Sequence, residues 1–257
     1  MSLFARLGVR ARRDPKLPVT LEPFPEICVH GVIRASVLVL VVDMMAGFVA
    51  EERCEGDWTF TTDLSLRAPA RHVPERVEAH GESLRSGRGL VSAGVHLRAG
   101  GADFAYGVAG FIRLPRRPGD PPKPHLHEDA ELLHLPPIQR PLVEEVGVEV
   151  IDASRGHVEV ELADALRNPA GALQGAMASL IVETAGEALA EHHRGAAQIL
   201  TDLDLRYLAM GREGPIYSNA SWIGGPEAAV MRVELRDRGN RDRLIVAALA
   251  RTCDAPG

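Results

Sequence analysis

The chain has 257 residues, of which 46% are hydrophobic and 25% charged, so it can form one large or two small globular domains. A formal net charge of −6 argues against nucleic-acid binding, which needs Lys and Arg gathered in excess on one face. Three scattered cysteines without a C-x-x-C pair are typical of a reducing compartment, and we expect a cytoplasmic protein.

The first apolar element follows a basic N-terminal segment. Residues 1–22 lack the apolar stretch and small-residue cleavage site of a secretory signal, and we interpret them as a flexible arm. Residues 35–50 are strongly apolar, but the run is shorter than the roughly 18 to 20 residues that span a bilayer, and it carries Asp43 at its middle. The pattern predicts a buried helix and no membrane partner.

Alternating segments after this helix predict four strands, at residues 58–68, 75–85, 89–99 and 103–114. Residues 116–138 are rich in proline and charge, which is typical of a linker. Two further strands are predicted at 143–154 and 156–163, before a second apolar helix within residues 168–193. Four more strands are predicted after it, at 197–208, 215–223, 228–237 and 243–252.

The two halves of the chain repeat one pattern. The segment TDLSLRAPA at 62–70 matches TDLDLRYLA at 201–209, and residues 28–47 align with 168–187, which places Gly31 on Gly171 and Asp43 on Glu183. One helix followed by four antiparallel strands predicts an α+β unit whose sheet wraps the helix. We therefore expect repeats at 23–115 and 139–257 that pair their sheets edge to edge, which covers the open edges.

The stretch NPAGALQGAMASLIVE, residues 168–183, resembles the signature of hotdog-fold acyl-CoA thioesterases of the phenylacetyl-CoA and 4-hydroxybenzoyl-CoA type. The resemblance implies a double hotdog, in which each of two repeats has a central helix wrapped by an antiparallel sheet. It also implies an enzyme that hydrolyses an acyl-CoA or acyl-carrier-protein thioester without a metal or redox cofactor. A homo-oligomer of such chains is compatible with this architecture.

By the resemblance, individual residues take the family's positions. Asn168 stands at the amide position and Gly171 at the turn glycine. Gln174 stands where the family usually has histidine, Gly175 is the first glycine of the pair, and Glu183 is the acid. The chain departs from the family pattern where Gln174 replaces histidine and Ala176 replaces the second glycine. In the first half Cys28, Arg34 and Ala35 stand where Asn, Gln and Gly stand in the second.

Helix geometry decides which acid serves which helix end. A helix N-terminus offers unpaired N–H groups, so the Gly175 N–H can form part of an oxyanion hole. Gly175 and Glu183 are separated by about 12 Å along one helix, so they cannot act on one carbonyl. If the helices run antiparallel, Asp43 serves Gly175 and Glu183 faces Arg34 and Ala35. The catalytic candidates are therefore Asp43, Asn168, Gln174 and Gly175, with Glu183 at a divergent second site, and the acid is either a general base or a nucleophile.

Simpler interpretations stay open for these residues. Either acid could reach solvent or pair with an arginine, the glycines could permit close helix packing, and Asn168 could only shape a turn. Arg67 and Arg206 could bind CoA phosphates or pair with acids on the sheet. The histidines at 125, 127, 192 and 193 have a metal-like composition, but their places in a linker and at a helix end argue against a metal site.

Two other functions compete with hydrolysis. A hydratase or dehydratase on the same fold needs a catalytic histidine, and His30 is the one placed near a helix start. A non-catalytic acyl-CoA-binding or scaffold protein is the alternative outside the enzymes, because a fold does not by itself imply catalysis.

Overall fold

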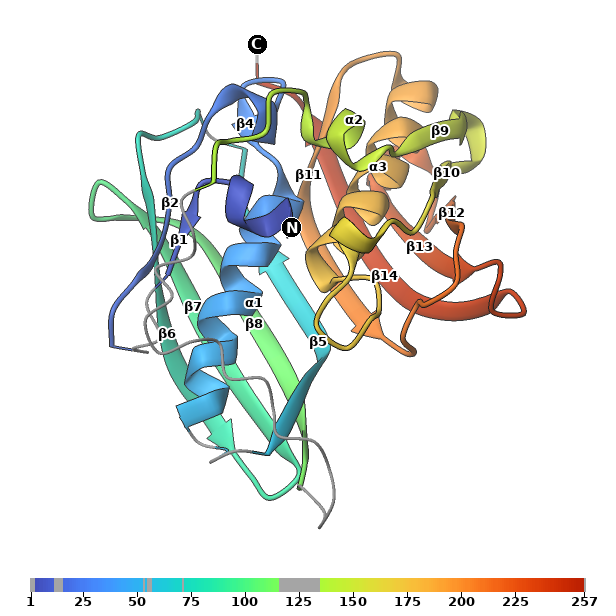
Figure 1. Ribbon diagram of the computed structural model, residues 1–257. Helices are drawn as coiled ribbons and strands as arrows, with labels where there is room; N and C mark the ends of the chain where they lie inside the picture. The colour runs from blue at the N-terminus through green and yellow to red at the C-terminus, as the bar shows by residue number, and fades with distance from the viewer. Residues whose placement is uncertain are drawn as a thin grey trace.

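The computed structural model describes residues 3–11, 16–52, 54, 57–70, 72–115 and 135–256, and the structural statements below concern these residues. Two long helices and one large antiparallel sheet dominate the chain (Figure 1). No helix in the described part of the chain combines the length and hydropathy needed to cross a membrane.

Both predicted helices form where the apolar runs stand. Helix α1 spans Ala35–Glu52 and buries most of its side chains, among them Leu38 and Met45. Helix α3 spans Gly175–Arg194, begins after the N-cap residue Gln174 and ends at Gly195, whose φ of 69° is the left-handed conformation that glycine adopts most easily. A short helix, α2, spans Leu142–Val146 and occupies the beginning of a segment for which we expected a strand.

All eight strands predicted after the two helices are present. In the first half they are β5 (Trp58–Arg67), β6 (Val77–Ser86), β7 (Leu90–Ala99) and β8 (Ala102–Leu114). In the second half they are β11 (Gln198–Tyr207), β12 (Ile216–Trp222), β13 (Val230–Asp237) and β14 (Arg243–Asp254). The pair expected before α3 is β9 (Glu149–Asp152) and β10 (His157–Val160).

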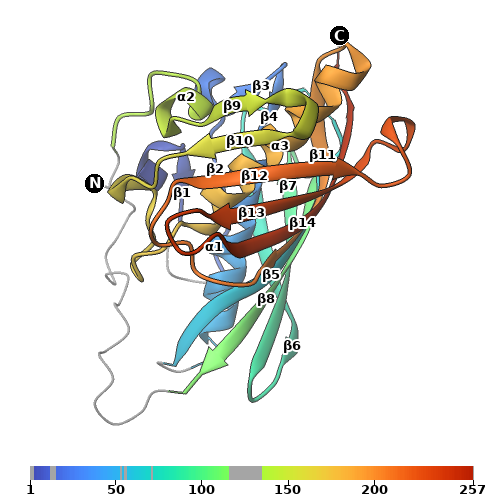
Figure 2. The ribbon, with the colours of Figure 1, turned by 90° about the vertical axis from the view of Figure 1, so that its right-hand side faces the viewer.

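The sheet has twelve strands in the order β1-β2-β6-β7-β8-β5-β11-β14-β13-β12-β10-β9, and every pairing is antiparallel. Read outward from its centre, each side meets corresponding strands in the same order (Figure 2). At the centre, β5 lies against β11, with Asp202 opposite Arg67 and Arg206 opposite Asp63. The two matching TDL-x-LR segments are therefore neighbours.

The sheet curves around the two helices and encloses the core. Leu64 and Leu66 of β5 and Leu203 and Leu205 of β11 are fully buried, whereas alternate residues on these strands are partly or fully exposed. Burial of each such leucine contributes about 1.5 to 3 kcal/mol relative to exposure. Helices α1 and α3 also pack against one another, which brings the N-terminus of each close to the other's middle (Figure 1).

The expectation of a flexible N-terminal arm is wrong for its described residues. Strands β1 (Val9–Arg10) and β2 (Val19–Leu21) extend the sheet, and β2 pairs with β6 through Val19 opposite Ala79. Leu7, Val19 and Leu21 are fully buried, so the segment gains hydrophobic stabilisation that fixes it to the domain. The linker expected at 116–138 lies mostly outside the described residues, and 135–138 form neither helix nor strand.

Candidate active site

A tight turn leads into the N-terminus of α3. The side-chain Oδ1 of Asn168 accepts hydrogen bonds from the N–H groups of Ala170 and Ala172, at 3.0 and 3.1 Å. Gly171 has a φ of 75°, which a residue with a side chain rarely adopts. Asn168 therefore shapes the turn that aims the helix start, and the structure shows this role for it.

Gln174 caps α3 with its own side chain. Its Oε1 accepts from the N–H groups of Ala176 at 2.6 Å and Met177 at 3.2 Å, and its carbonyl accepts from Ala178 at 3.0 Å. Among the described residues, the N–H of Gly175 has no hydrogen-bond partner. One donor of the first turn thus stays open, at the positive end of the helix dipole.

Asp43 projects from the middle of α1 and is held by a strand residue. The hydroxyl of Thr61, on β5, donates to Asp43 Oδ1 at 2.8 Å. Burial raises the pKa of Asp43 above its ordinary value, and the Thr61 hydrogen bond opposes part of that shift. Thr61 was not among the residues that the sequence singled out, because it reads as one of several polar residues on a strand.

Tyr207, at the end of β11, links Asp43 to Gly175. Its hydroxyl lies 3.3 Å from the Gly175 carbonyl oxygen, and a Cβ added to Gly175 would come within 3.0 Å of that hydroxyl. Burial and the charge of Asp43 raise the pKa of Tyr207 well above its ordinary value. Residues from α1, β11 and α3 therefore meet at the start of α3, and the tyrosine among them was missed by the sequence analysis.

The start of α1 differs, because a side chain from α3 accepts hydrogen bonds from its first N–H groups. The N–H groups of Ala35 and Ser36 donate to the two carboxylate oxygens of Glu183, at 2.8 and 3.1 Å. Glu183 is only 1% exposed. The expectation that Glu183 faces Ala35 and Arg34 is confirmed, and the contact joins the middle of α3 to the N-terminus of α1, as antiparallel helices require.

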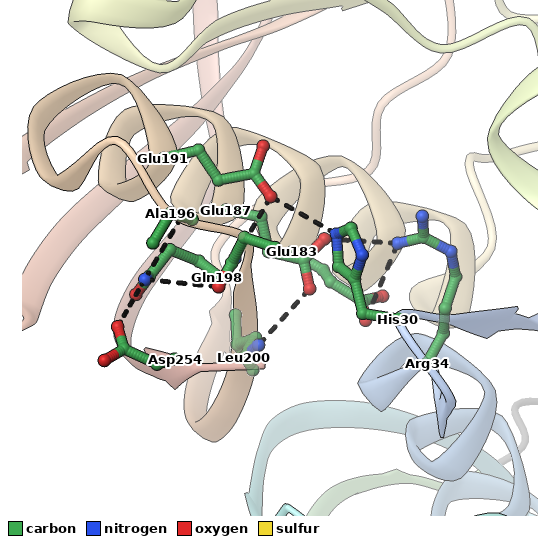
Figure 3. A network of polar contacts seen from close by, with 10 residues as sticks. His30, Arg34, Glu183, Glu187, Glu191, Ala196, Gln198, Leu200 and Asp254 are labelled. Carbon is green, nitrogen blue, oxygen red and sulfur yellow. Dashed lines mark hydrogen bonds and ion pairs between the residues drawn. The ribbon is translucent and has the colours of Figure 1, made fainter. Parts of the chain in front are cut away.

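Arg34 and Glu187 complete a buried charge cluster with Glu183 (Figure 3). The Arg34 Nη1 lies 3.3 Å from Glu187 Oε2 and 3.8 Å from Glu183 Oε1. Glu187 Oε1 also accepts from the N–H of Leu200 at 3.2 Å. Burial and the neighbouring charge of Glu183 raise the pKa of Glu187 to about 8, against the opposing effect of Arg34. The sequence signal that could have found Glu187 is its place one turn after Glu183 in an apolar helix.

The structure therefore separates the five predicted catalytic residues into two groups. Asn168, Gln174 and Gly175 form the start of α3, and Asp43 is coupled to that end through Tyr207. Glu183 belongs to the start of α1, eight residues or about 12 Å along the helix from Gly175. Among the described residues, the N–H of Gly175 at the α3 end is open, whereas the equivalent N–H of α1, on Ala35, is already bonded.

The other candidates have surface or structural contacts. His30 lies 3.3 Å from Glu191, and both side chains are about 40% exposed. Arg67 pairs with Asp204 at 2.9 Å and with Asp202 at 3.3 Å, which supports its role on the sheet. In the described part of the chain, no three His, Cys, Asp or Glu side chains are grouped to hold a metal ion. The histidines at 125 and 127 lie outside the described residues.

No family model matches the sequence, and no curated protein matches it. Solved structures do match over nearly the whole chain. An acyl-ACP thioesterase from Bacteroides thetaiotaomicron VPI-5482 is 11% identical, with a TM-score of 0.63 over 95% of this chain and 100% of that one. A conserved protein with hot dog fold from Alicyclobacillus acidocaldarius is 10% identical, with a TM-score of 0.59 over 100% and 99%.

The chain has a hotdog fold. A 12:0-ACP thioesterase from Umbellularia californica, 9% identical, matches this hotdog chain with a TM-score of 0.59 over 94% of it and 98% of the other chain. The resemblance read from residues 168–183 is confirmed at the level of the fold. Identities this low show the fold and leave the chemistry to the residues of the site.

Proposed function

We propose that this hotdog protein is a thioesterase that hydrolyses an acyl-CoA or acyl-carrier-protein thioester at the N-terminus of α3. The observation that carries the proposal is the meeting of two helices at Tyr207. Its hydroxyl contacts Gly175, whose N–H is open among the described residues, and burial and the charge of Asp43, from the other helix, raise the pKa of Tyr207. The structural neighbours include proteins named as thioesterases, which supports the same reaction class.

The chemistry follows from where charge develops during hydrolysis. The thioester oxygen becomes negative as a nucleophile adds to its carbon, and the Gly175 N–H and the helix dipole stabilise that charge. Asp43 either removes a proton from the attacking water or attacks the carbon itself. Thr61 donates to one oxygen of Asp43, and the other, which has no partner among the described residues, can contact the water or the substrate.

Glu183 has a structural role in this proposal. Its two oxygens already bind the N–H groups of Ala35 and Ser36, so a substrate carbonyl at α1 would have to displace a buried carboxylate. Displacement would leave Arg34 and Glu187 without part of their cluster, which is costly in a buried site. We therefore assign one working site to each chain, at α3.

We further propose that the chain is a double hotdog, whose repeats contain residues 23–115 and 139–257 and are joined by a linker at 116–138. The strand order, which is the same on both sides of β5 and β11, supports this division. Strands β1 and β2 of the first half occupy the places that β9 and β10, respectively, occupy in the second, so the first repeat also includes part of the segment before residue 23.

The test is turnover of a panel of acyl-CoA and acyl-carrier-protein thioesters, followed by release of free thiol. A kcat above about 0.1 s⁻¹ with any of them supports hydrolysis. Saturable binding without thiol release would instead favour the acyl-CoA-binding or scaffold alternative. The hydratase alternative relied on His30, which contacts Glu191 rather than any group at the α3 site.

A further inference from the structure

The Tyr207 hydroxyl is only weakly hydrogen-bonded within the described part of the protein. Among the described residues it makes one hydrogen bond, which is long at 3.3 Å and ends on the carbonyl of Gly175. In an α-helix that carbonyl already accepts from the N–H four residues later. The hydroxyl can therefore turn to another acceptor at little cost to the fold.

The hydroxyl is also a proton donor near the open helix N–H. Burial and the charge of Asp43 disfavour the phenolate, and the pKa of Tyr207 lies well above its ordinary value. The side chain thus keeps its proton at neutral pH. The hydroxyl covers the side of Gly175 where a Cβ would stand, at 3.0 Å, and this glycine carries the free N–H.

We propose that the Tyr207 hydroxyl is the second donor of the oxyanion site and shares the thioester oxygen with the Gly175 N–H. The inference rests on the proposed thioesterase function and adds a residue to its machinery. Two donors on one oxygen are the usual arrangement for stabilising a tetrahedral intermediate, and removal of one typically lowers kcat by 10² to 10³-fold.

The role is specific to the second half of the chain. Tyr207 aligns with Ala68 in the matching TDL-x-LR segments, so the start of α1 has no equivalent hydroxyl. At that end the N–H groups already donate to Glu183, so they are not open to a substrate oxygen. The tyrosine therefore stands only at the helix end whose N–H is open.

The reaction balances with Tyr207 protonated throughout. Where Asp43 acts as general base, it takes one proton of water as the water oxygen bonds to the thioester carbon. The carbonyl electron pair moves to oxygen, which accepts hydrogen bonds from Gly175 and Tyr207. When the carbon–oxygen double bond re-forms, the carbon–sulfur bond breaks and the proton on Asp43 passes to the thiolate. The products are a carboxylic acid and a free thiol.

The test compares Tyr207→Phe with the wild type, with Asp43→Asn and with Tyr217→Phe as a matched control. Tyr217 lies on β12, where its hydroxyl donates to Asp242 at the surface and, among the described residues, bonds neither Asp43 nor Gly175. We expect Tyr207→Phe to lower kcat about 100-fold while KM changes less than about threefold and the melting temperature is preserved. Tyr217→Phe should keep wild-type kinetics.

The possible failures are distinguishable. No thiol release by the wild type would overturn the thioesterase function itself. An active wild type, an inactive Asp43→Asn and a fully active Tyr207→Phe would overturn only the role of Tyr207, as would a raised KM with unchanged kcat. If Tyr207→Phe unfolds, Tyr207→Gln, which keeps a donor, is compared with Tyr207→Leu, which does not. Equal activity in these two would likewise reject a donor role.

Discussion

Glu183 and Asp43 occupy aligned positions on the two helices, yet the structure assigns them opposite tasks. Glu183 caps α1 from inside the core, whereas Asp43 is bonded, among the described residues, by Thr61 alone and acts on Tyr207, which contacts the start of α3. We predict that Glu183→Gln mainly lowers stability and that Asp43→Asn mainly lowers activity. Both substitutions remove one negative charge and preserve side-chain shape, so each serves as the control for the other.

The stability cost of Glu183→Gln can be estimated from its contacts. Two N–H groups donate to the carboxylate, at 2.8 and 3.1 Å, and hydrogen bonds to a charged group contribute about 1.5 to 3 kcal/mol each. The glutamine side chain keeps one oxygen that accepts from one of these N–H groups, but its NH₂ group faces the other N–H and cannot accept from it. Loss of the Glu183 charge also makes ionisation of Glu187 easier, which restores a partner for Arg34. We expect a net loss of about 3 kcal/mol, or about 6 to 12 °C in melting temperature.

The activity cost of Asp43→Asn comes from the chemistry. The amide can still accept from Thr61, but it can neither remove a proton from water nor attack a thioester, so kcat should fall at least about 100-fold. Because burial already penalises the charged form of Asp43, its neutral replacement should leave the melting temperature unchanged or raised. Thermal unfolding and thiol release are measured on both variants. A folded Glu183→Gln without activity beside an active Asp43→Asn would reverse the assignment, and two active variants would refute the carboxylate mechanism.

Three further substitutions test the surroundings of the two helix ends. The pKa of Glu187 is raised from 4.5 to about 8, so the folded state binds this proton more tightly than the unfolded state. The resulting contribution to stability is complete below pH 4.5 and is lost as the pH rises to about 8. Glu187→Gln should flatten that part of the stability profile measured by urea unfolding, and an unchanged slope would contradict the shift. Gly175→Ala should lower kcat at least about tenfold without lowering the melting temperature, because the methyl group meets the Tyr207 hydroxyl at 3.0 Å beside the open N–H. Asp43→Glu should lower kcat by at least about 100-fold although it keeps the carboxylate. The longer side chain can accept from the open N–H at the start of α3, as Glu183 does at α1, and so occupy the place of the substrate oxygen. Wild-type turnover would exclude this contact.

Most of the architecture could be predicted from periodicity and from the internal repeat. The alternation of apolar residues located all eight strands after the helices, and the alignment of Asp43 with Glu183 correctly predicted that Glu183 faces Ala35 across antiparallel helices. The short strands β1 and β2 could not be predicted in the same way. Two or three residues are too few to show a period, and their stability comes from pairing with β6 and from burial of Leu7 and Leu21.

The site itself was only partly predictable. Asn168, Gln174 and Gly175 stand together in the sequence, so their meeting at one helix start follows from local structure. Tyr207 and Thr61 come from strands in different halves of the chain, and their contacts depend on how the two strands pass the helices. Nothing local distinguishes them from other polar or aromatic strand residues, and only the tertiary packing shows their place.

The difference between the two helix ends is a matter of one capping residue and one methylene group. The guanidinium of Arg34 cannot accept a hydrogen bond, so the first N–H groups of α1 need an acceptor from elsewhere, and Glu183 is long enough to supply it. Gln174 caps α3 by itself, and Asp43, shorter than Glu183 by about 1.5 Å, bonds Thr61 instead. A fold selected only for stability would gain from closing both ends, because an open N–H beside a desolvated acid lowers stability. The open end of α3 has the properties that an electron-rich oxygen requires of its binding site, and this argues that the asymmetry is kept for a ligand.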